Sequence, residues 1–555
     1  MKLWMTGAAV LALLAGCAEP QSATGGGAME SAAPAVSKVL DGNGFAYVGP
    51  VVTEDRAAFL DHRYWAELTP VGGGEGFTLE GYLQQIRPDS GEGVWTVRTD
   101  NLPAGRYRAQ GFFCAGPRVA IDGCQGEAVG AVSPTLVADD ATVRVGPEGY
   151  LQRPDGTVFL KTGAGSPENI LSFAEFDGTR DAGGFELALG DDQLHRFAPH
   201  LADWRAGDPV WGENADKGKA IIGLFNYYAD VGVTSQYLVG MNLHGDGQDV
   251  FPYTTPNDPY VFDLSKLAQW AQVFDHANAR GVMIHFLFTE TENESYFEVH
   301  DGVEIGEDFA DSRKLYYREM VARFGHLPLL SWNLGEENGI EGDTGAPPYR
   351  LPTTAPQRLR FTDYIAALDA RDHPVVMHTW PDREAVTHAD MLGHPTFDGM
   401  ALQGHHSYFD KVVEWKRRGA EAGHPWMVSV DEPQGWEFGA PPDAQAGVPR
   451  PEITSVLWPS LLGGATGVEW YFGWQNNAPT SDLSNEDQRT RNALFAASAR
   501  VRRFFETLPL TQMTSRREGE AMILEGAGRR LVMEGDTIRY TVDGQTRTLD
   551  PHDPE

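Results

Sequence analysis

Hydrophobic and polar residues follow two different rhythms along the chain. Between about residues 40 and 148 they alternate in short runs, for example at 77–83, 94–97 and 107–113, and turn-forming residues separate the runs. Alternation with a period of two is the pattern of a strand with one buried face. Several short strands divided by turns are typical of a β-sandwich, so we expect a sandwich domain at 38–148.

Beyond residue 155 the rhythm changes, and single apolar runs are followed by longer stretches with apolar residues at spacings of three and four. This pattern predicts parallel βα units. The predicted strands are 158–162, 234–239, 282–288, 329–334, 375–379, 400–404, 427–431 and 467–472. The predicted helices include 264–280, 312–324, 357–371 and 485–508. Eight such units indicate an α/β fold, a (β/α)8 TIM barrel at 149–508.

An open, doubly wound sheet is the alternative arrangement of such units. The chain has no Gly-x-Gly-x-x-Gly after the first predicted strand and no Walker loop, the motifs that nucleotide-binding open sheets carry. The barrel is therefore the preferred fold. Alternation with a period of two returns at 531–534 and 537–542, which predicts a small β-rich appendage at 509–555.

Residues 1–17 have the pattern of an export signal: Lys2, an apolar run at 8–14, and small residues up to Cys17. The apolar run is too short to cross a bilayer as a helix. The last four residues, Leu-Ala-Gly-Cys, resemble a bacterial lipobox, and this implies that Cys17 carries lipid and begins the mature protein. A plain signal peptide with a chance cysteine is the alternative.

Residues 18–37 are rich in Ala, Gly, Ser and Pro, which predicts a flexible linker between the lipid and the folded domains. Because Ala18 rather than Asp follows Cys17, the resemblance to bacterial lipoproteins implies sorting to the outer membrane. We therefore expect an exported protein, on the periplasmic or cell-surface side, that contacts the membrane through its N-terminal lipid.

The charge balance is acidic, with 78 Asp and Glu against 44 Lys and Arg. A negative field repels phosphate groups, so nucleic acid is not an expected partner. The 14 Trp and 18 Tyr offer flat faces that suit stacking on sugar rings, although aromatic cores give the same counts. After Cys17, only Cys114 and Cys124 remain, and an exported compartment permits a disulfide between them.

Polar residues follow several predicted strands, and the C-terminal strand ends form the active face of a parallel barrel. Glu336 and Glu337 follow the fourth strand, and Glu432 follows the seventh within Asp431-Glu432-Pro433. Carboxylates at these ends face each other across the barrel mouth. One can protonate a leaving oxygen while the other attacks an anomeric carbon, as in glycosidic cleavage by double displacement. The alternative is a purely structural role, in which Glu336 and Glu337 cap the following helix and Asp431-Glu432-Pro433 forms a turn.

Residues 150–505 resemble glycoside hydrolases of the clan whose catalytic glutamates follow strands four and seven, especially bacterial proteins that join an N-terminal sandwich to such a barrel. The segments that carry the likeness are 159–169, 285–293 and 332–338. It implies a retaining hydrolase with Glu337 as acid/base and Glu432 as nucleophile. Clan members usually have Asn where this chain has Glu336, so Glu336 is the alternative acid/base. The clan arginine after strand two is also absent.

Further residues near the strand ends are expected to bind a polysaccharide or oligosaccharide. His406-Ser407-Tyr408 resembles the clan's His-x-Tyr, in which the tyrosine steadies the nucleophile. The predicted substrate-binding residues are His285, Glu290, Glu292, Asn333, His378, Trp380, His406, Tyr408, Trp436 and Trp470. The histidines can equally be structural. Residues 244–249 hold several oxygen donors without the full calcium-loop signature, so no metal is assigned there, and a structural calcium stays the alternative. No cofactor is expected.

Two other functions fit the same residues. A carbohydrate-binding lipoprotein whose barrel has lost catalysis would account for the absent asparagine and arginine. A polysaccharide lyase would use His and Tyr as base and acid, and it would need a cation to neutralise the uronate. These residues leave open which glycan is bound, and whether it is cut internally or from an end.

Overall fold

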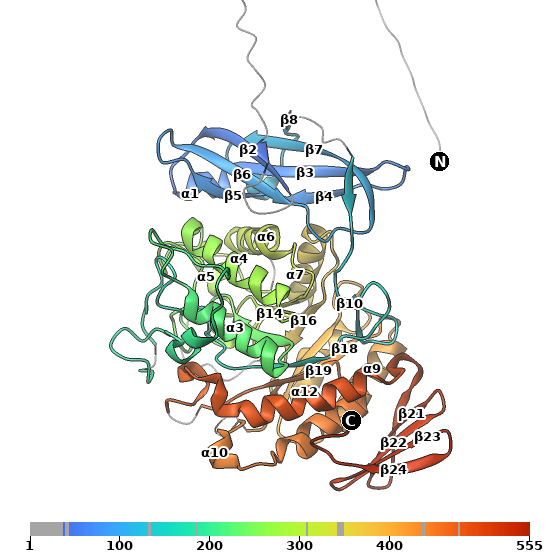
Figure 1. Cartoon of the computed structure of the whole chain (residues 1–555). Coiled ribbons are helices and arrows are strands. Elements are labelled where there is room, and N and C mark those ends of the chain that lie inside the picture. Colours follow the sequence, from blue (N-terminus) through green and yellow to red (C-terminus); the bar gives the residue numbers. More distant parts are fainter. Residues whose placement is uncertain are drawn as a thin grey trace, which may run out of the picture. The chain divides into compact units, whose positions relative to one another are not determined.

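The computed structural model describes residues 37–38, 44–130, 135–184, 186–306, 309–340, 349–435, 437, 439–474 and 478–555. Cys17, the rest of the predicted signal peptide and Trp436 lie outside the described residues, as does the predicted linker except for its last residue. Pro34–Glu555 form one compact unit, in which N-terminal sheets, a barrel and a C-terminal sheet follow one another along the chain (Figure 1).

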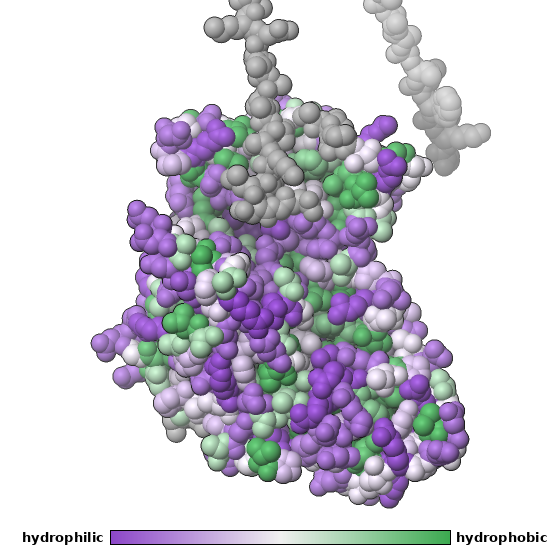
Figure 2. All heavy atoms as spheres, in the orientation of Figure 1, coloured by the Kyte–Doolittle hydropathy of each residue, from purple (hydrophilic) through white to green (hydrophobic). Residues whose placement is uncertain are grey.

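Hydrophilic residues predominate on the face shown in Figure 2, and hydrophobic ones are scattered among them in small groups. This agrees with the formal net charge of −34. Among the described residues, no helix is both long and apolar enough to cross a membrane.

The N-terminal region consists of two antiparallel sheets. One contains β1 (Ser37–Lys38), β2 (Gly44–Val51), β6 (Glu92–Arg98) and β5 (Tyr82–Ile86), and the other contains β4 (Phe77–Glu80), β3 (His62–Pro70), β7 (Gly105–Ala115), β8 (Glu127–Val129) and β9 (Leu136–Ala138). Trp95 of the first sheet and Phe113 of the second meet edge to face, with ring centroids 5.0 Å apart. Aromatic side chains therefore contribute to the core between the sheets.

The chain passes from one sheet to the other at Gly81, between β4 and β5. A Cβ atom at this position would lie 2.7 Å from the Tyr64 ring and 2.8 Å from the Tyr64 carbonyl oxygen. Glycine fits this close crossing because it has no side chain. The alternation at 77–83 predicted strand structure, but not that its two halves belong to different sheets.

The central region is a closed barrel of eight parallel strands, which confirms the predicted (β/α)8 fold. The strands are β12 (Lys161–Ala164), β13 (Ser235–Val239), β14 (Met283–Leu287), β15 (Leu330–Asn333), β16 (Val375–His378), β17 (Gly399–Gly404), β18 (Met427–Pro433) and β19 (Gly467–Trp470). The long helices of the region are α3 (Lys219–Val231), α4 (Leu264–Ala279), α6 (Asp311–Phe324), α7 (Ala355–Leu368), α9 (Tyr408–Glu421) and α12 (Asn492–Glu506). Every barrel-strand residue is buried, as expected for a parallel sheet covered on both faces.

The first barrel strand begins three residues later than predicted, at Lys161–Ala164 rather than 158–162. Phe159 instead packs with the first residues of β14 and β18, at the N-terminal end of the barrel. Gly163 has low strand propensity, yet a Cβ there would lie 2.2 Å from Ser235 Oγ on the neighbouring strand. The apolar run therefore mostly precedes the strand, and the strand itself contains the small residues Gly163 and Ala164.

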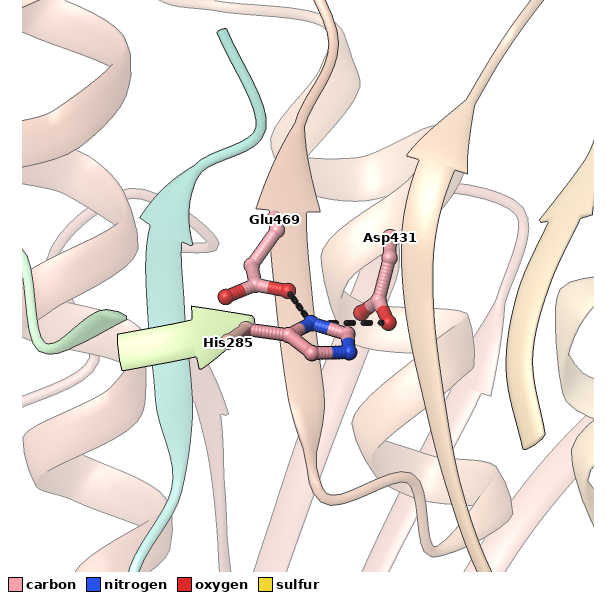
Figure 3. A group of neighbouring side chains, drawn as sticks. All are labelled: His285, Asp431 and Glu469. Atoms are coloured by element: carbon pink, nitrogen blue, oxygen red, sulfur yellow. Dashed lines mark hydrogen bonds and ion pairs between the residues drawn. The ribbon is translucent and has the colours of Figure 1, made fainter. Parts of the chain in front are cut away.

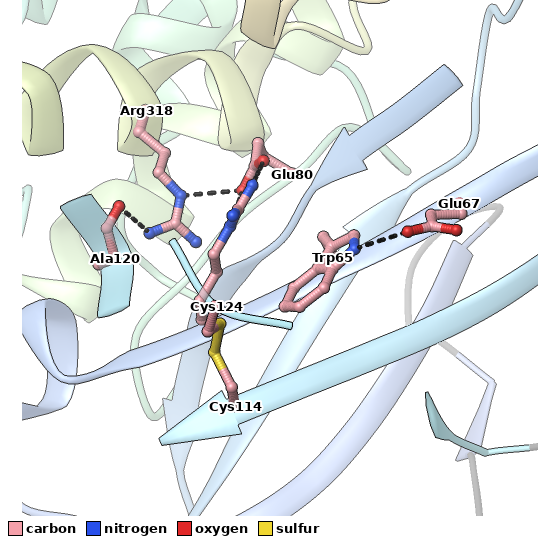
Figure 4. Close-up of a disulfide and its surroundings, with 8 residues drawn as sticks. Trp65, Glu67, Glu80, Cys114, Ala120, Cys124 and Arg318 are labelled. Atoms are coloured by element: carbon pink, nitrogen blue, oxygen red, sulfur yellow. Dashed lines mark hydrogen bonds and ion pairs between the residues drawn. A yellow bond between two sulfur atoms is a disulfide. The ribbon is translucent and has the colours of Figure 1, made fainter. Parts of the chain in front are cut away.

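The N-terminal sheets are attached to the barrel by buried polar contacts (Figure 4). The disulfide between Cys114 and Cys124, with Cα atoms 6.6 Å apart, closes a loop that contains Ala120. Arg318 on α6 donates to the Ala120 carbonyl at 3.2 Å and to Glu80 Oε2 at 2.9 Å. Burial raises the pKa of Glu80, but Arg318 and Arg63 together lower it by more. Glu80 is also paired with Arg63, but loss of Glu80 would leave the buried Arg318 guanidinium without its carboxylate, so the Glu80–Arg318 pair links the two regions.

The C-terminal region is an antiparallel sheet of β20 (Thr514–Glu518), β21 (Ala521–Gly526), β22 (Arg529–Glu534), β23 (Thr537–Val542) and β24 (Gln545–Leu549). It lies beside α11 (Trp458–Gly463), which precedes the last barrel strand. The Ser515 hydroxyl donates to the Leu462 carbonyl at 2.6 Å, and the Trp458 indole N–H donates to the Pro551 carbonyl at 2.8 Å.

Candidate active site

A cavity of about 440 Å³ lies at the C-terminal ends of the barrel strands. It is lined by eight carboxylic acids: Glu168, Asp246, Glu290, Glu292, Glu336, Glu337, Glu432 and Asp482. The other lining residues are Thr291, Trp380, Pro381, Gln403, Tyr471 and Trp474. Within the described part of the chain, no Lys, Arg or His lines it. This face is where parallel barrels carry their active sites, so the cavity is the candidate site.

Both glutamates after β15 line the cavity, although neighbours on a strand point to opposite faces. Strand β15 ends at Asn333, and Glu337 has a left-handed backbone conformation with φ of 52°. This conformation is costly for a residue other than glycine and is found at functional sites. The Glu336 N–H donates to the Thr289 carbonyl at 3.0 Å, and the Trp380 indole donates to the Glu337 carbonyl at 2.7 Å. The turn is therefore fixed on both sides.

Glu432 comes from β18, at a break in its pairing with β17. Leu402 pairs with Val430 and Gln403 pairs with Glu432, so Asp431 is an extra residue on β18. Such bulges redirect side chains beside active sites. Glu432 is 7% exposed, and its Oε2 accepts a hydrogen bond from Gln403 Nε2 at 2.7 Å. This hydrogen bond holds the Glu432 carboxylate in one orientation at the cavity wall.

Glu336 belongs to two groups of closely spaced side chains. Ligating atoms of Glu336, His378 and Glu432 lie within 4.8 Å of one another, and so do carboxylate oxygens of Glu168, Glu290 and Glu336. The second group has the oxygen donors that a hard cation such as Ca²⁺ prefers. Without a cation, like charges at this spacing cannot all be ionised, so the group must share protons.

Both candidate acids have the electrostatic environment of a proton donor. Burial, followed by the charge of Glu432, raises the pKa of Glu336 well above its usual range. The same two causes, in the same order, raise the pKa of Glu337. A raised carboxyl pKa beside an ionised carboxylate is the usual division between general acid and nucleophile.

Several predicted site residues lie outside the cavity wall. His285, Asn333 and His378 are completely buried and do not line it. Trp470 is also buried, and its indole N–H donates to Ser498 on α12 at 3.1 Å. The neighbouring residue, Tyr471, lines the cavity instead.

The His-x-Tyr segment also lies outside the cavity lining. His406 is exposed. The Tyr408 hydroxyl donates to the Gly404 carbonyl at 2.8 Å and accepts from the Gln434 N–H at 2.9 Å. Tyr408 therefore holds the backbone just beyond Glu432 rather than the carboxylate itself.

Other lining residues were not among the predicted site residues. Glu168 and Asp246 fall within segments that the sequence had singled out, at 159–169 and 244–249. Within the latter, Asp249 receives hydrogen bonds from Asn242 and Asn169, so its oxygens serve the loop's own structure. Asp482 begins a short 3₁₀ helix, Asp482–Ser484, after the last barrel strand and carries no sequence signal.

The pKa values of Asp246 and Asp482 are also raised in this cavity. Burial, followed by the charge of Glu292, raises the pKa of Asp246 to about 8. Burial also raises the pKa of Asp482 to about 7, against the opposing hydrogen bond from Ser166. Such a carboxyl binds a proton more tightly when folded than when unfolded, where its pKa is about 3.9. Its contribution to stability is present below pH 4 and is lost as the pH rises toward 8.

We therefore expect Asp246→Asn to stabilise the protein at pH 8.5, because the amide has no charge to crowd its neighbours. The melting temperature should rise by about 2–4 °C there, and the difference from the parent should shrink at pH 5. Asp89→Asn, on an exposed turn, is the matched control. An unchanged or lower melting temperature of Asp246→Asn at pH 8.5 would contradict the expectation.

No family model matches this chain, and no curated protein matches it. A solved structure of a candidate glycoside hydrolase from Bacteroides vulgatus ATCC 8482 aligns with a TM-score of 0.55 at 14% identity, over 88% of this chain and 82% of that one. An endo-1,4-β-mannanase from Rhizomucor miehei aligns with a TM-score of 0.40 at 12% identity, over 64% of this chain and 99% of that one. An exo-β-1,4-mannosidase from Opitutaceae bacterium strain TAV5 aligns with a TM-score of 0.41 at 14% identity, over 66% and 63%.

These likenesses concern the fold. The chain is an eight-stranded α/β barrel protein with a carboxylate-rich cavity at the C-terminal strand ends. Its structural neighbours include glycoside hydrolases.

Proposed function

We propose that the protein is a glycoside hydrolase that cleaves O-glycosidic bonds of a polysaccharide or oligosaccharide by retaining double displacement. The observation that carries the proposal is the cavity, in which Glu432 of β18 lies close to the two glutamates that follow β15. Ionised Glu432 attacks the anomeric carbon. Glu337 protonates the leaving oxygen and then activates the water that releases the product, with Glu336 as the alternative acid/base.

Aromatic residues of the cavity suit this substrate. Trp380, Tyr471 and Trp474 line it beside the carboxyl groups. Aromatic faces stack on the apolar faces of sugar rings, and carboxylates accept hydrogen bonds from sugar hydroxyls. Because the Trp380 indole N–H donates to the Glu337 backbone, its ring is held in a fixed place next to the proposed acid.

The lining residues weigh against a lyase. A lyase needs a cation to neutralise the uronate, and none of the described lining residues is basic.

The test of the proposed function is a screen of protein lacking residues 1–37 against a panel of plant and algal polysaccharides. New reducing ends would support a hydrolase. Absorbance from an unsaturated sugar would indicate a lyase, and binding without product would indicate the carbohydrate-binding alternative.

We also propose that the protein is anchored to the outer membrane through lipid on Cys17, on the strength of the Leu-Ala-Gly-Cys segment and the following Ala18. Cys17→Ser should move the protein from the membrane fraction to the soluble fraction, because the thiol that accepts the lipid is gone. Ala18→Ser, which keeps the cysteine, is the control and should stay with the membrane. A Cys17→Ser protein that fractionates like the parent would exclude the anchor.

A further inference from the structure

Beneath the cavity lies a polar cluster from five barrel strands: Lys161, His285, Asn333, Asp431 and Glu469. All five side chains are buried, with residue exposures of 0–1%. Figure 3 shows that His285, Asp431 and Glu469 point toward one another inside the barrel. Branched apolar residues usually fill this layer, and buried charges are costly unless they are paired and hydrogen-bonded.

A lysine ammonium occupies the centre of the cluster. Lys161 Nζ lies 2.9 Å from Glu469 Oε2 and 3.3 Å from Asp431 Oδ1. Burial lowers the pKa of Lys161, but the two carboxylates raise it by more, so the ammonium stays charged. Asp431 reaches this layer because it is the extra residue of the β18 bulge. Glu469 Oε2 accepts from this ammonium and also lies 2.9 Å from His285 Nδ1.

The protonation of His285 follows from the orientation of Asn333. Asn333 Oδ1 accepts from the backbone N–H groups of Gly335, at 3.1 Å, and His378, at 3.2 Å. The other amide atom, Nδ2, lies 3.0 Å from His285 Nε2 and can only donate. His285 Nε2 is therefore an acceptor without a proton, and the ring proton is on Nδ1, which lies 2.9 Å from Glu469 Oε2.

The neighbouring lysine does not change this assignment. If Nδ1 accepted from Lys161, at 3.3 Å, both ring nitrogens would lack a proton and the imidazole would be an anion. Burial and the charge of Lys161 also hold the pKa of His285 well below its usual range, so the ring stays neutral. The hydrogen bonds thus run in one direction, from the Asn333 amide through His285 to Glu469.

The same amide contacts both sides of the cavity above it. Gly335, whose N–H it accepts, directly precedes Glu336 and Glu337. His378, the other donor, has its Nε2 3.2 Å from Glu432 Oε2. One side-chain oxygen therefore ties the turn that bears the proposed acid to the strand that contacts the proposed nucleophile.

We propose that Lys161, Glu469 and His285 are positioning residues for the cavity above them. They fix the Asn333 amide in one orientation, and this amide fixes the turn that carries the two glutamates. A shift of about 1 Å in catalytic geometry can cost about 10²-fold in rate. Only the kinetic part of this inference rests on the proposed hydrolase function.

The first test is spectroscopic and needs no substrate. Long-range ¹H–¹⁵N spectra of the protein labelled with [¹⁵N]histidine should show the His285 ring as neutral, with its proton on Nδ1, and unchanged between pH 5 and 9. His285→Gln should remove that signal and so assign it. A His285 ring that titrates in this range, or that carries its proton on Nε2, would overturn the proposal whatever the protein hydrolyses.

The second test uses Asn333→Asp, which keeps the shape but removes the donor to His285 Nε2. We expect kcat to fall by about 10²-fold with KM changed by less than about threefold, and the His378 ring signal to shift. Ser331→Ala is the matched control, because this serine is on the same strand and its hydroxyl has no hydrogen-bond partner among the described residues. An Asn333→Asp protein with the control's kcat, or with an unshifted His378 signal, would overturn the proposal. If Asn333→Asp does not fold, the spectrum of the parent still decides.

Discussion

Glu432→Ala is expected to lower kcat by about 10⁴-fold or more, because it removes the group that attacks the anomeric carbon. The fold should survive, since the substitution relieves a crowded set of carboxylates rather than removing an apolar contact. The loss of kcat is measured with the best polysaccharide from the screen, by assaying the reducing ends that hydrolysis releases. Circular dichroism and the melting temperature establish that the variant is folded.

Azide provides the positive half of this experiment. The anion is small enough to enter the space left by the carboxylate, and it should restore turnover of an activated substrate as a glycosyl azide of inverted anomeric configuration. The matched control is Glu437→Ala, an exposed acid five residues further along, which should keep the parent's activity. Retention of more than about a tenth of the parent kcat by Glu432→Ala, or the absence of an azide product, would show that Glu432 is not the nucleophile.

The sequence predicted the barrel because its strands are buried on both faces and read as continuous apolar runs. The error on the first strand has a physical cause, since Gly163 is required by the approach of Ser235 and not by strand propensity. Gly81 shows the same limit, because a crossing between sheets depends on a distant backbone carbonyl. Local patterns do not record such contacts.

The rule that active residues follow the barrel strands found much of the cavity, including Glu290, Glu292 and Trp380. It could not separate layers within the barrel. Residues such as His285 and Asn333 have the chemistry of ligands, and they also point inward, but they lie below the cavity floor. The level of each side chain along the barrel axis depends on how the strands are staggered around the barrel. The sequence of a single strand does not determine this stagger. Asp482 was missed because it begins a short 3₁₀ helix well beyond Trp470, the end of the last barrel strand.

The second large effect is expected from Glu337→Ala, and it distinguishes Glu337 from Glu336 as the general acid. Glu337→Ala should lower kcat/KM for natural linkages by about 10²–10⁴-fold, the usual contribution of a general acid. Substrates with good leaving groups, such as dinitrophenyl glycosides, need little protonation, so their first step should be nearly unaffected. Glu337→Gln should behave alike, because the amide keeps the shape of the carboxyl but has no acidic proton. The measurement is the dependence of kcat/KM on the pKa of the leaving group.

Glu336→Ala is the decisive comparison, because the pKa of Glu336 is also raised and a carboxylate oxygen of Glu336 lies within 4.8 Å of ligating atoms of both Glu432 and His378. If Glu336 only binds substrate and steadies Glu432, its loss should lower kcat/KM to a similar degree for good and poor leaving groups. A steep leaving-group dependence in Glu336→Ala, together with parent-like behaviour of Glu337→Ala, would transfer the acid role to Glu336. The nucleophile and the positioning residues below it would keep their assignments, because neither depends on which glutamate of the turn carries the proton.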